Sequence, residues 1–170
     1  TIPNKICIMD IFPKPEQLIL PGNVEWVTQN ILDESMPHKE KYDIVIMSGV
    51  LHHLADKDNN IRRNLTICLK NMKKILAAEG YCLIFESICP PYLDTMQDLL
   101  YPLYSRILTI AFKFPYARLL SLKEVTDALK AMDFHYKMLD FKQLKQHYFA
   151  GCKVSSKIYP ISYICVELRC

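Results

Sequence analysis

Three short, almost entirely apolar runs, each ending in a polar residue, constrain most strongly what this chain can fold into. They are KICIMD at residues 5–10, YDIVIMS at residues 42–48 and YCLIFE at residues 81–86. Runs of this length without regular polar alternation are typical of strands buried on both faces of a parallel sheet. VEWVTQ at residues 24–29, rich in β-branched and aromatic residues, predicts a further strand.

Helical patterns lie between and after these strands. Residues 59–78 place apolar side chains at helical spacing, which predicts an amphipathic helix with Gly80 as its C-terminal stop. Ser121 and Glu124 have the spacing of a capping box, which predicts the start of a second helix. Strands that alternate with helices indicate an α/β fold, here a Rossmann-like open, mostly parallel sheet flanked by helices.

The region of residues 90–120 differs in character from the rest. It is apolar and aromatic, and Pro102 and Arg106 interrupt it, so residues 94–114 predict a kinked pair of helices and not a membrane span. Such an insert is a possible lid over a substrate, and packing in the core is the alternative.

The chain ends in two further predicted strands and contains no linker. The strands are expected at residues 136–141 and 158–168, with a polar, glycine-containing connection between them. No internal repeat is present, and 170 residues are enough to bury a sizeable core. We therefore expect one domain over residues 1–170.

Composition excludes several classes of protein. The net charge of +3, from 21 Lys and Arg against 18 Asp and Glu, is too weak and dispersed for a nucleic-acid surface. The seven cysteines form no CxxC pair, which favours free, mostly buried thiols in a reducing compartment. No charge-free apolar run reaches the ~18 residues of a membrane span. We expect a cytoplasmic protein whose oligomeric state the sequence does not show.

Polar residues at strand ends are the first candidates for a site, because ligands of open parallel sheets bind outside the carboxyl ends of the strands. Asp10, Asn30 and Ser48-Gly49 hold such positions. A carboxylate at Asp10 can accept hydrogen bonds from both hydroxyls of a ribose, or form a turn before Pro13. Asn30 can accept from an adenine amino group, or cap the loop that follows.

The pair His52-His53 raises the question of a metal site, which we do not expect. Adjacent residues of a helix point about 100° apart, whereas helical ligand pairs are spaced i, i+4, and no Cys or carboxylate cluster lies nearby in the sequence. A proton acceptor near a substrate suits His53 better; a histidine bonded to the backbone is the alternative. Glu86 is either a strand-end cap or part of a pocket wall.

In this order, four segments resemble the class I S-adenosylmethionine-dependent methyltransferases, in particular their small-molecule branch. The segments are ICIMD, VEWVTQNILDESMP, YDIVIMSGVLHHL and LKNMKKILAAEGYCLIFE, and the resemblance covers residues 5–89 well. It implies that an acid at the second strand's end, here Asp10, binds the cofactor ribose, and that Asn30 reaches the adenine. The cofactor-binding residues that it implies are Asp10, Ile11, Asn30, Ile31, Ser48 and Gly49.

The chain also departs from that family. Asn30 stands where the family usually has Asp, and Ala-Glu-Gly stands in place of Pro-Gly-Gly. The family's first strand and its GxGxG turn are missing, and KICIMD cannot be that strand because only about a dozen residues separate it from VEWVTQ. In the family's strand order, 3-2-1-4-5-7-6, this absence predicts that the sheet is split or that its strands pair abnormally, which leaves edges open. We expect the first strand upstream of this sequence, or else a degenerate, non-catalytic relative.

The resemblance implies methyl transfer from S-adenosylmethionine to an O, N or C atom of a small or lipid-like acceptor. The sulfonium is already activated, so the protein mainly aligns the nucleophile with the methyl group. A nicotinamide-dependent oxidoreductase is the alternative enzyme, because an acid at a strand end binds ribose there as well. A non-catalytic binding or scaffold module is the third possibility.

Overall fold

The computed structural model describes residues 6–33, 41–113, 116–143, 145–149, 152–155, 157 and 160–169. Lys5, Phe114, Ile158 and Tyr159, which belong to predicted elements, lie outside these residues. The strands are β1 (Ile6–Asp10), β2 (Val24–Thr28), β3 (Tyr42–Ser48), β4 (Leu76–Cys89), β5 (Leu120–Ser121), β6 (His135–Gln143), β7 (Gln146–Phe149), β8 (Cys152–Ser155) and β9 (Ser162–Arg169). The helices are η1 (Leu51–Leu54, a 3-10 turn), α1 (Ile61–Ile75), α2 (Pro91–Phe112) and α3 (Leu122–Ala131).

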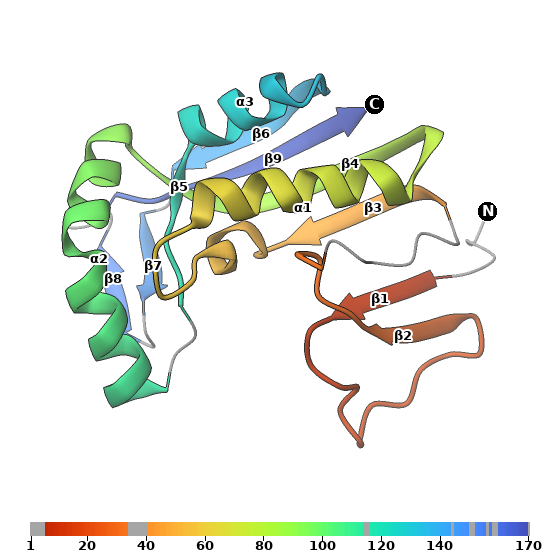
Figure 1. Ribbon diagram of the computed structural model, residues 1–170, viewed down its shortest axis with the longest axis horizontal. Helices are drawn as coiled ribbons and strands as arrows, with labels where there is room; N and C mark the ends of the chain where they lie inside the picture. Colours follow the sequence, from red (N-terminus) through yellow and green to blue (C-terminus); the bar gives the residue numbers. More distant parts are fainter. Residues whose placement is uncertain are drawn as a thin grey trace.

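The main sheet has the order β3-β4-β9-β6, with the short β5 beside β4. β3 and β5 run parallel to β4, whereas β9 runs antiparallel to both β4 and β6. α1 and α3 lie along one face of this sheet (Figure 1). Their buried residues, among them Leu65, Leu69 and Leu129, form one hydrophobic core with residues of β4 and β9 such as Ile84 and Ile164.

β1 and β2 form a separate two-stranded parallel sheet. In Figure 1 this pair lies beside β3 and points in the same direction. Among the described residues, no strand pairing joins β1 to β3. The order β2-β1, a gap, then β3-β4-β9-β6 is the one expected when the first strand of 3-2-1-4-5-7-6 is missing. The predicted split of the sheet is confirmed.

The interpretation of Gly80 as a helix stop is wrong. α1 already ends at Ile75, and β4 begins at Leu76, so that Gly80 lies inside the strand. The register of β3 against β4 is irregular here, and a Cβ on Gly80 would lie 2.9 Å from the carbonyl oxygen of Tyr42. Glycine is required at this position because the start of β3 approaches closely.

Two other predictions for the second half of the chain are corrected. Residues 91–112 form one helix, α2, with Pro102 inside it, and not a kinked pair of helices. The polar connection before the last strand contains a hairpin, β7–β8, that the sequence did not predict. In contrast, the capping box of α3 is confirmed: the Ser121 hydroxyl accepts from the Glu124 N–H, and the Glu124 carboxylate accepts from the Ser121 N–H.

Polar side chains join α1, α2 and α3 at one end of the molecule. The Arg118 guanidinium is fully buried and pairs with Asp98 of α2 at 2.9 Å and with Glu124 of α3 at 3.2 Å. Arg62 of α1 reaches the same two carboxylates. A buried cation is tolerated because both acids lie against it. The backbone N–H of Arg118 also donates to the His52 carbonyl, which fixes the segment after α2 against η1.

Candidate functional site

A cavity of about 560 Å³ lies between the β1–β2 pair and β3. Apolar side chains of both parts line it, including Met9, Val45 and Met47, and Met72 of α1 contributes to it as well. The seven residues that the sequence nominated also line it: Asp10, Ile11, Asn30, Ile31, Ser48, Gly49 and His53. The structure thus brings together residues that are up to 43 positions apart (53 − 10) on three strand ends and η1.

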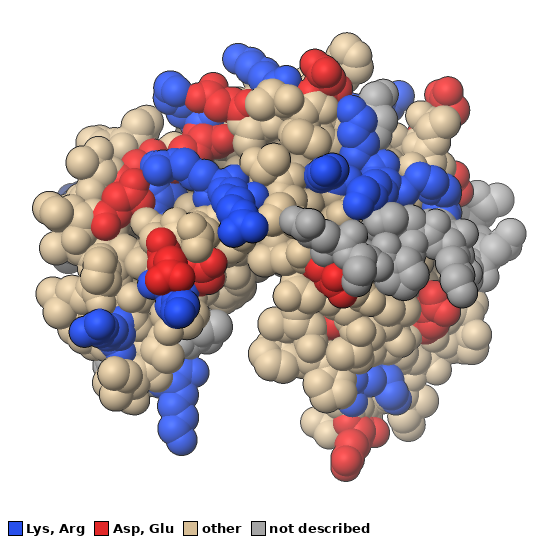
Figure 2. Space-filling view, in the orientation of Figure 1, with Lys and Arg blue, Asp and Glu red and all other residues tan. Residues whose placement is uncertain are grey.

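The carboxyl ends of β1, β2 and β3 open toward a deep notch in the surface. Figure 2 shows this notch between the part of the molecule that contains α2 and the part that contains β1 and β2. In Figure 1 the three strand arrows point toward it, and η1 lies at its inner end. A ligand in the cavity therefore has access from solvent at the edge where ligands of open α/β sheets bind.

Asp10, the last residue of β1, forms the turn considered for it, and its ribose role stays a prediction. Its Oδ1 accepts a hydrogen bond of 3.0 Å from the N–H of Phe12, which forms the turn. Its backbone carbonyl accepts from the N–H of Gln29 and so aligns β1 with β2. A carboxylate has about four acceptor positions, so one hydrogen bond to Phe12 leaves capacity for hydroxyl donors.

Asn30 follows β2 and caps its own loop. Its Oδ1 accepts from the N–H of Leu32 at 2.9 Å, and its carbonyl accepts from the N–H of Asp33. The capping interpretation of Asn30 is therefore confirmed, and the remaining lone pair of Oδ1 is what an adenine amino group would use.

Asn71 on α1 holds this loop in place, a role that no local sequence pattern predicted. Its side chain is buried, and its Nδ2 donates to the carbonyls of Ile31 at 2.8 Å and Asp33 at 3.0 Å. Its Oδ1 accepts from Lys74. A polar residue on the buried face of a predicted helix is the only signal that could have drawn attention to it.

Ser48 and Gly49 form the turn that leaves β3. Gly49 has a φ of +62°, a left-handed conformation that glycine adopts without a Cβ penalty. Its N–H donates to the carbonyl of Phe85 at 2.9 Å, so the turn stays anchored to β4. The side chain of Ser48 is exposed at the cavity.

Glu86 holds η1 from beneath. This carboxylate is 1% exposed; Oε2 accepts from the N–H of Leu51 at 2.7 Å, and Oε1 lies 2.8 Å from Nδ1 of His52. Oε1 also accepts from the N–H of Ser87. Glu86 lies within β4, which extends to Cys89, so the expectation that the strand ends at this carboxylate is wrong.

The two adjacent histidines have different environments. His52 points to Glu86, whereas His53 lines the cavity and hydrogen-bonds with the backbone of Tyr116. Partial burial and the neighbouring His52 ring lower the pKa of His53 below its usual value. The neutral imidazole, which can accept a proton, is therefore favoured at neutral pH.

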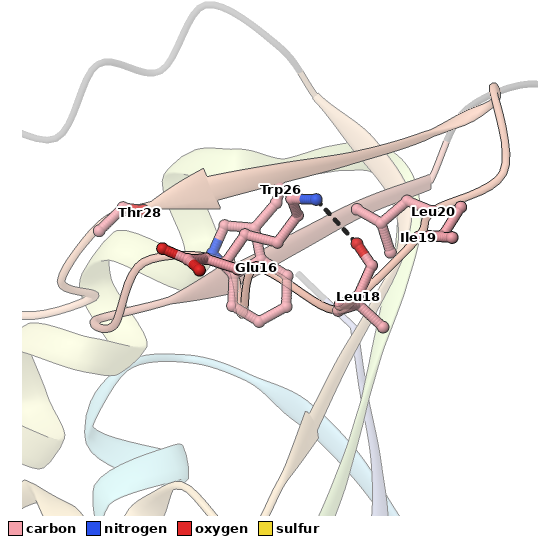
Figure 3. A pocket seen from close by; sticks show the side chains of 7 residues that line it. Glu16, Leu18, Ile19, Leu20, Trp26 and Thr28 are labelled. Atoms are coloured by element: carbon pink, nitrogen blue, oxygen red, sulfur yellow. Dashed lines mark hydrogen bonds between the residues drawn. The ribbon is translucent and has the colours of Figure 1, made fainter.

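A second hollow, of about 610 Å³, lies on the loop that joins β1 to β2 (Figure 3). Its residues include Glu16, Leu18, Ile19 and Trp26. The dashed line in Figure 3 is the hydrogen bond from Lys14 to the Leu18 carbonyl, and the Trp26 indole donates to the Phe12 carbonyl. These bonds fold the loop onto β2. The hollow contains none of the nominated residues.

A metal-binding cluster and a membrane-spanning helix are both absent from the described residues. No group of three or more His, Cys, Asp or Glu side chains within them is placed to hold a metal ion. No helix within them is long and apolar enough to cross a membrane. Four of the cysteines that the structure describes are buried: Cys68, Cys82, Cys89 and Cys165.

Comparison with solved structures identifies the fold. A SAM-dependent methyltransferase from Methanosarcina mazei has a TM-score of 0.53 and 14% identity, over 88% of this chain and 72% of that one. NodS, an N-methyltransferase from Bradyrhizobium japonicum in complex with S-adenosylhomocysteine, has a TM-score of 0.50 and 14% identity, over 95% and 66%. Human N-acetylserotonin methyltransferase in complex with SAM has a TM-score of 0.53 and 15% identity, over 97% and 40%.

Sequence comparison adds no family assignment. No protein-family model matches the chain, and no curated protein matches it. The chain spans only part of the length of the structures above. With the strand order and the split between β1 and β3, the structural matches show that this chain has the Rossmann-like fold of the class I methyltransferases.

Proposed function

We propose that this protein binds S-adenosylmethionine at the carboxyl ends of β1, β2 and β3 and transfers its methyl group to a small-molecule acceptor. The observation that supports this most is the convergence of Asp10, Asn30 and the Ser48-Gly49 turn on one cavity. These residues come from three different strand ends. In a fold shared with proteins solved with SAM or its demethylated product, such a set is suited to one extended ligand.

Each part of the cavity suits one part of that ligand. The Asp10 carboxylate would accept the ribose hydroxyls, and Asn30 would accept from the adenine amino group. The neighbouring Ile11 and Ile31 offer apolar surface to the adenine ring. The Ser48-Gly49 turn would lie beside the methionine part, where the lack of a side chain on Gly49 allows close approach.

We further propose His53 as the proton acceptor for acceptors that lose a proton on methylation. SAM supplies an activated methyl group, so the protein needs to hold the nucleophile in line and remove its proton. His53 faces the cavity, and its lowered pKa keeps the imidazole neutral. The lid role of residues 90–120 stays a prediction. Among the described residues of that range, none lines the cavity, although Tyr116 lies against His53.

Calorimetry tests the proposed function directly. We expect SAM and S-adenosylhomocysteine to bind, and to raise the melting temperature by mass action. NADH, with the same adenosine but a different remainder, serves as the competing ligand. Binding of NADH without SAM would favour an oxidoreductase. Absence of binding by all three at millimolar concentration would leave a non-catalytic module and overturn the proposal.

A transfer assay tests the role of His53. SAM labelled on its methyl group is incubated with panels of phenols, amines and carboxylic acids, and the labelled product is counted. For any acceptor found, His53→Gln should lower kcat by about tenfold to a hundredfold while the Kd for SAM changes little. A Kd that rises as much as kcat falls would contradict a role in proton transfer.

A further inference from the structure

The buried Glu86 carboxylate determines which nitrogen of His52 carries a hydrogen. Its two oxygens accept from the backbone N–H groups of Leu51 at 2.7 Å and Ser87 at 2.8 Å. An ionised carboxylate has acceptor positions only. Nδ1 of His52, 2.8 Å from Oε1, therefore donates the hydrogen of this contact, and Nε2 of the neutral ring keeps its lone pair.

The rest of the His52 ring lies at the edge of the cofactor cavity. A Cβ on Gly49 would be 3.7 Å from Cε1 of His52, the ring atom between the two nitrogens. The ring centroids of His52 and His53 are 4.0 Å apart, and Gly49 and His53 both line the cavity. The His52 side chain is 25% exposed although Nδ1 faces a carboxylate that is 1% exposed. The exposed part of the ring thus lies away from Nδ1.

His53 also has one nitrogen engaged by the protein. Burial and the neighbouring His52 lower its pKa, whereas the hydrogen bond with the Tyr116 backbone acts in the opposite direction and raises that pKa. A hydrogen bond that favours the protonated ring is donated by the ring, so the Tyr116 carbonyl is the acceptor. The second nitrogen of the neutral His53 ring is left as an acceptor. Two adjacent side chains therefore each keep one acceptor nitrogen.

A metal ion is the first ligand to consider for two imidazole nitrogens. A metal site would need further ligands, and the described residues contain no group of three His, Cys, Asp or Glu side chains placed to hold an ion. The Glu86 oxygens are already engaged by two N–H groups and by His52. Hydrogen-bond donors of an organic molecule suit the two nitrogens better.

We propose that His52 is a specificity-determining residue of the acceptor site, and that this site takes molecules with two hydrogen-bond donors on neighbouring atoms. His53 keeps the role proposed above and accepts from the nucleophilic group. Nε2 of His52 accepts from the second donor. A molecule that lacks the second donor leaves this nitrogen without a partner and is disfavoured. The inference rests on the proposed function and adds to it the kind of acceptor.

Calorimetry with three aromatic probes tests the inference. Aromatic carriers suit the apolar wall that Met47, Val50 and Leu54 form beside His53. Catechol has two neighbouring hydroxyls, whereas phenol and guaiacol have one each and are smaller and larger than catechol. We expect catechol to bind about three- to tenfold more tightly than either, the contribution of one further hydrogen bond. Equal binding of the three, or no binding of catechol at millimolar concentration, would overturn the inference.

His52→Phe keeps an aromatic ring but removes both nitrogens, so it should abolish the preference for catechol. His135→Phe is the matched control, because His135 at the start of β6 is exposed and does not line the cavity. It should keep the full preference. If His52→Phe kept the preference too, His52 would not determine specificity.

NMR of the histidine ring nitrogens of the unchanged protein gives a second test, which does not depend on the folding of a variant. We expect the hydrogen of neutral His52 on Nδ1, and a hydrogen on Nε2 would overturn the inference. Binding of S-adenosylhomocysteine is measured in parallel. If it binds and catechol is not preferred, only this inference fails. If catechol is preferred and S-adenosylhomocysteine does not bind, the proposed function fails and the two-donor site stands.

Discussion

Nδ1 of His52 lies 2.8 Å from Oε1 of Glu86, a carboxylate that is 1% exposed. The same carboxylate accepts from the N–H of Leu51, so one side chain of β4 fixes both the start of η1 and the first histidine. His53, the next residue, is thereby directed to the cavity. The position of the proposed proton acceptor depends on a residue 33 positions later in the chain (86 − 53).

Glu86→Gln tests whether the Glu86 carboxylate holds η1 and His52 in position. The amide keeps the shape of the side chain, but its NH₂ group cannot accept from the three groups that now surround the carboxylate. We expect a loss of about 2 kcal/mol in the free energy of unfolding, measured with urea, since hydrogen bonds to a charged group contribute roughly 1.5–3 kcal/mol. Glu79→Gln, on the exposed part of the same strand, should cost less than about 0.5 kcal/mol. Equal effects of the two changes would contradict the role of Glu86.

Asn71→Leu tests the support of the loop after β2. It removes both donors from the carbonyls of Ile31 and Asp33, and should destabilise the protein by about 1–3 kcal/mol. Because this loop contains two of the proposed cofactor-binding residues, the affinity for S-adenosylhomocysteine should fall several-fold. Lys70→Leu, one residue earlier on the exposed side of α1, is the control and should change neither quantity. If the affinity for S-adenosylhomocysteine were unchanged in Asn71→Leu, the support of this loop by Asn71 would not contribute to cofactor binding.

Gly80→Ala tests the close approach of β3 to β4. The added methyl group would meet the carbonyl oxygens of Tyr42 at 2.9 Å and Asp43 at 3.0 Å, and backbone cannot move aside as a side chain does. We expect a loss of roughly 1–3 kcal/mol in urea unfolding, the usual cost of overpacking. At Gly22 a Cβ would meet nothing within 4 Å, so Gly22→Ala should be neutral. If Gly80→Ala left the free energy of unfolding unchanged, the start of β3 would be able to shift away from β4 at no cost.

The ion pairs around Arg118 predict acid sensitivity. Burial alone would raise the pKa of Glu124, but hydrogen bonds from Arg118 and Ser121 and the charges of Arg118 and Arg62 outweigh it, and the net pKa is lowered. A carboxyl with a depressed folded-state pKa stabilises the protein above its unfolded-state pKa, about 4.3 for Glu. This stability is lost as the pH falls through the lower, folded-state value.

Urea unfolding between about pH 6 and pH 3 measures this effect. Glu124→Gln should be less stable near pH 6 and should lose less stability than the unchanged protein as the pH falls. Asp58→Asn, at an exposed site, should keep the full pH dependence. If Glu124→Gln kept the same slope, Glu124 would not be responsible for the acid sensitivity.

Local patterns in the sequence predicted much of the fold. The apolar runs placed β1, β3 and β4, the β-branched and aromatic residues of VEWVTQ placed β2, and the Ser121–Glu124 spacing placed the start of α3. The predicted strand ends also gathered the nominated residues at one cavity. These features depend on neighbours within a few residues, or on the general rule that parallel strands share one carboxyl edge.

The remaining features depend on contacts between distant parts of the chain. Gly80 follows a helical pattern and therefore resembled a helix stop. The residue whose close approach requires a glycine there, Tyr42, is 38 positions earlier (80 − 42), so no local pattern reveals it. Asn71 reaches a loop 40 positions away, and Glu86 reaches the N–H of Leu51 over 35 positions.

Binding of S-adenosylhomocysteine to Asp10→Asn, measured by calorimetry together with the melting temperature, tests the proposed cofactor site most directly. The amide oxygen can still accept from the N–H of Phe12, so the turn and the melting temperature should be preserved. The loss of charge-assisted bonds to the ribose should raise the Kd by about ten- to a hundredfold. Asp58→Asn should bind like the unchanged protein. A change in Kd of less than about threefold for Asp10→Asn would contradict the account and leave Asp10 with its turn role only.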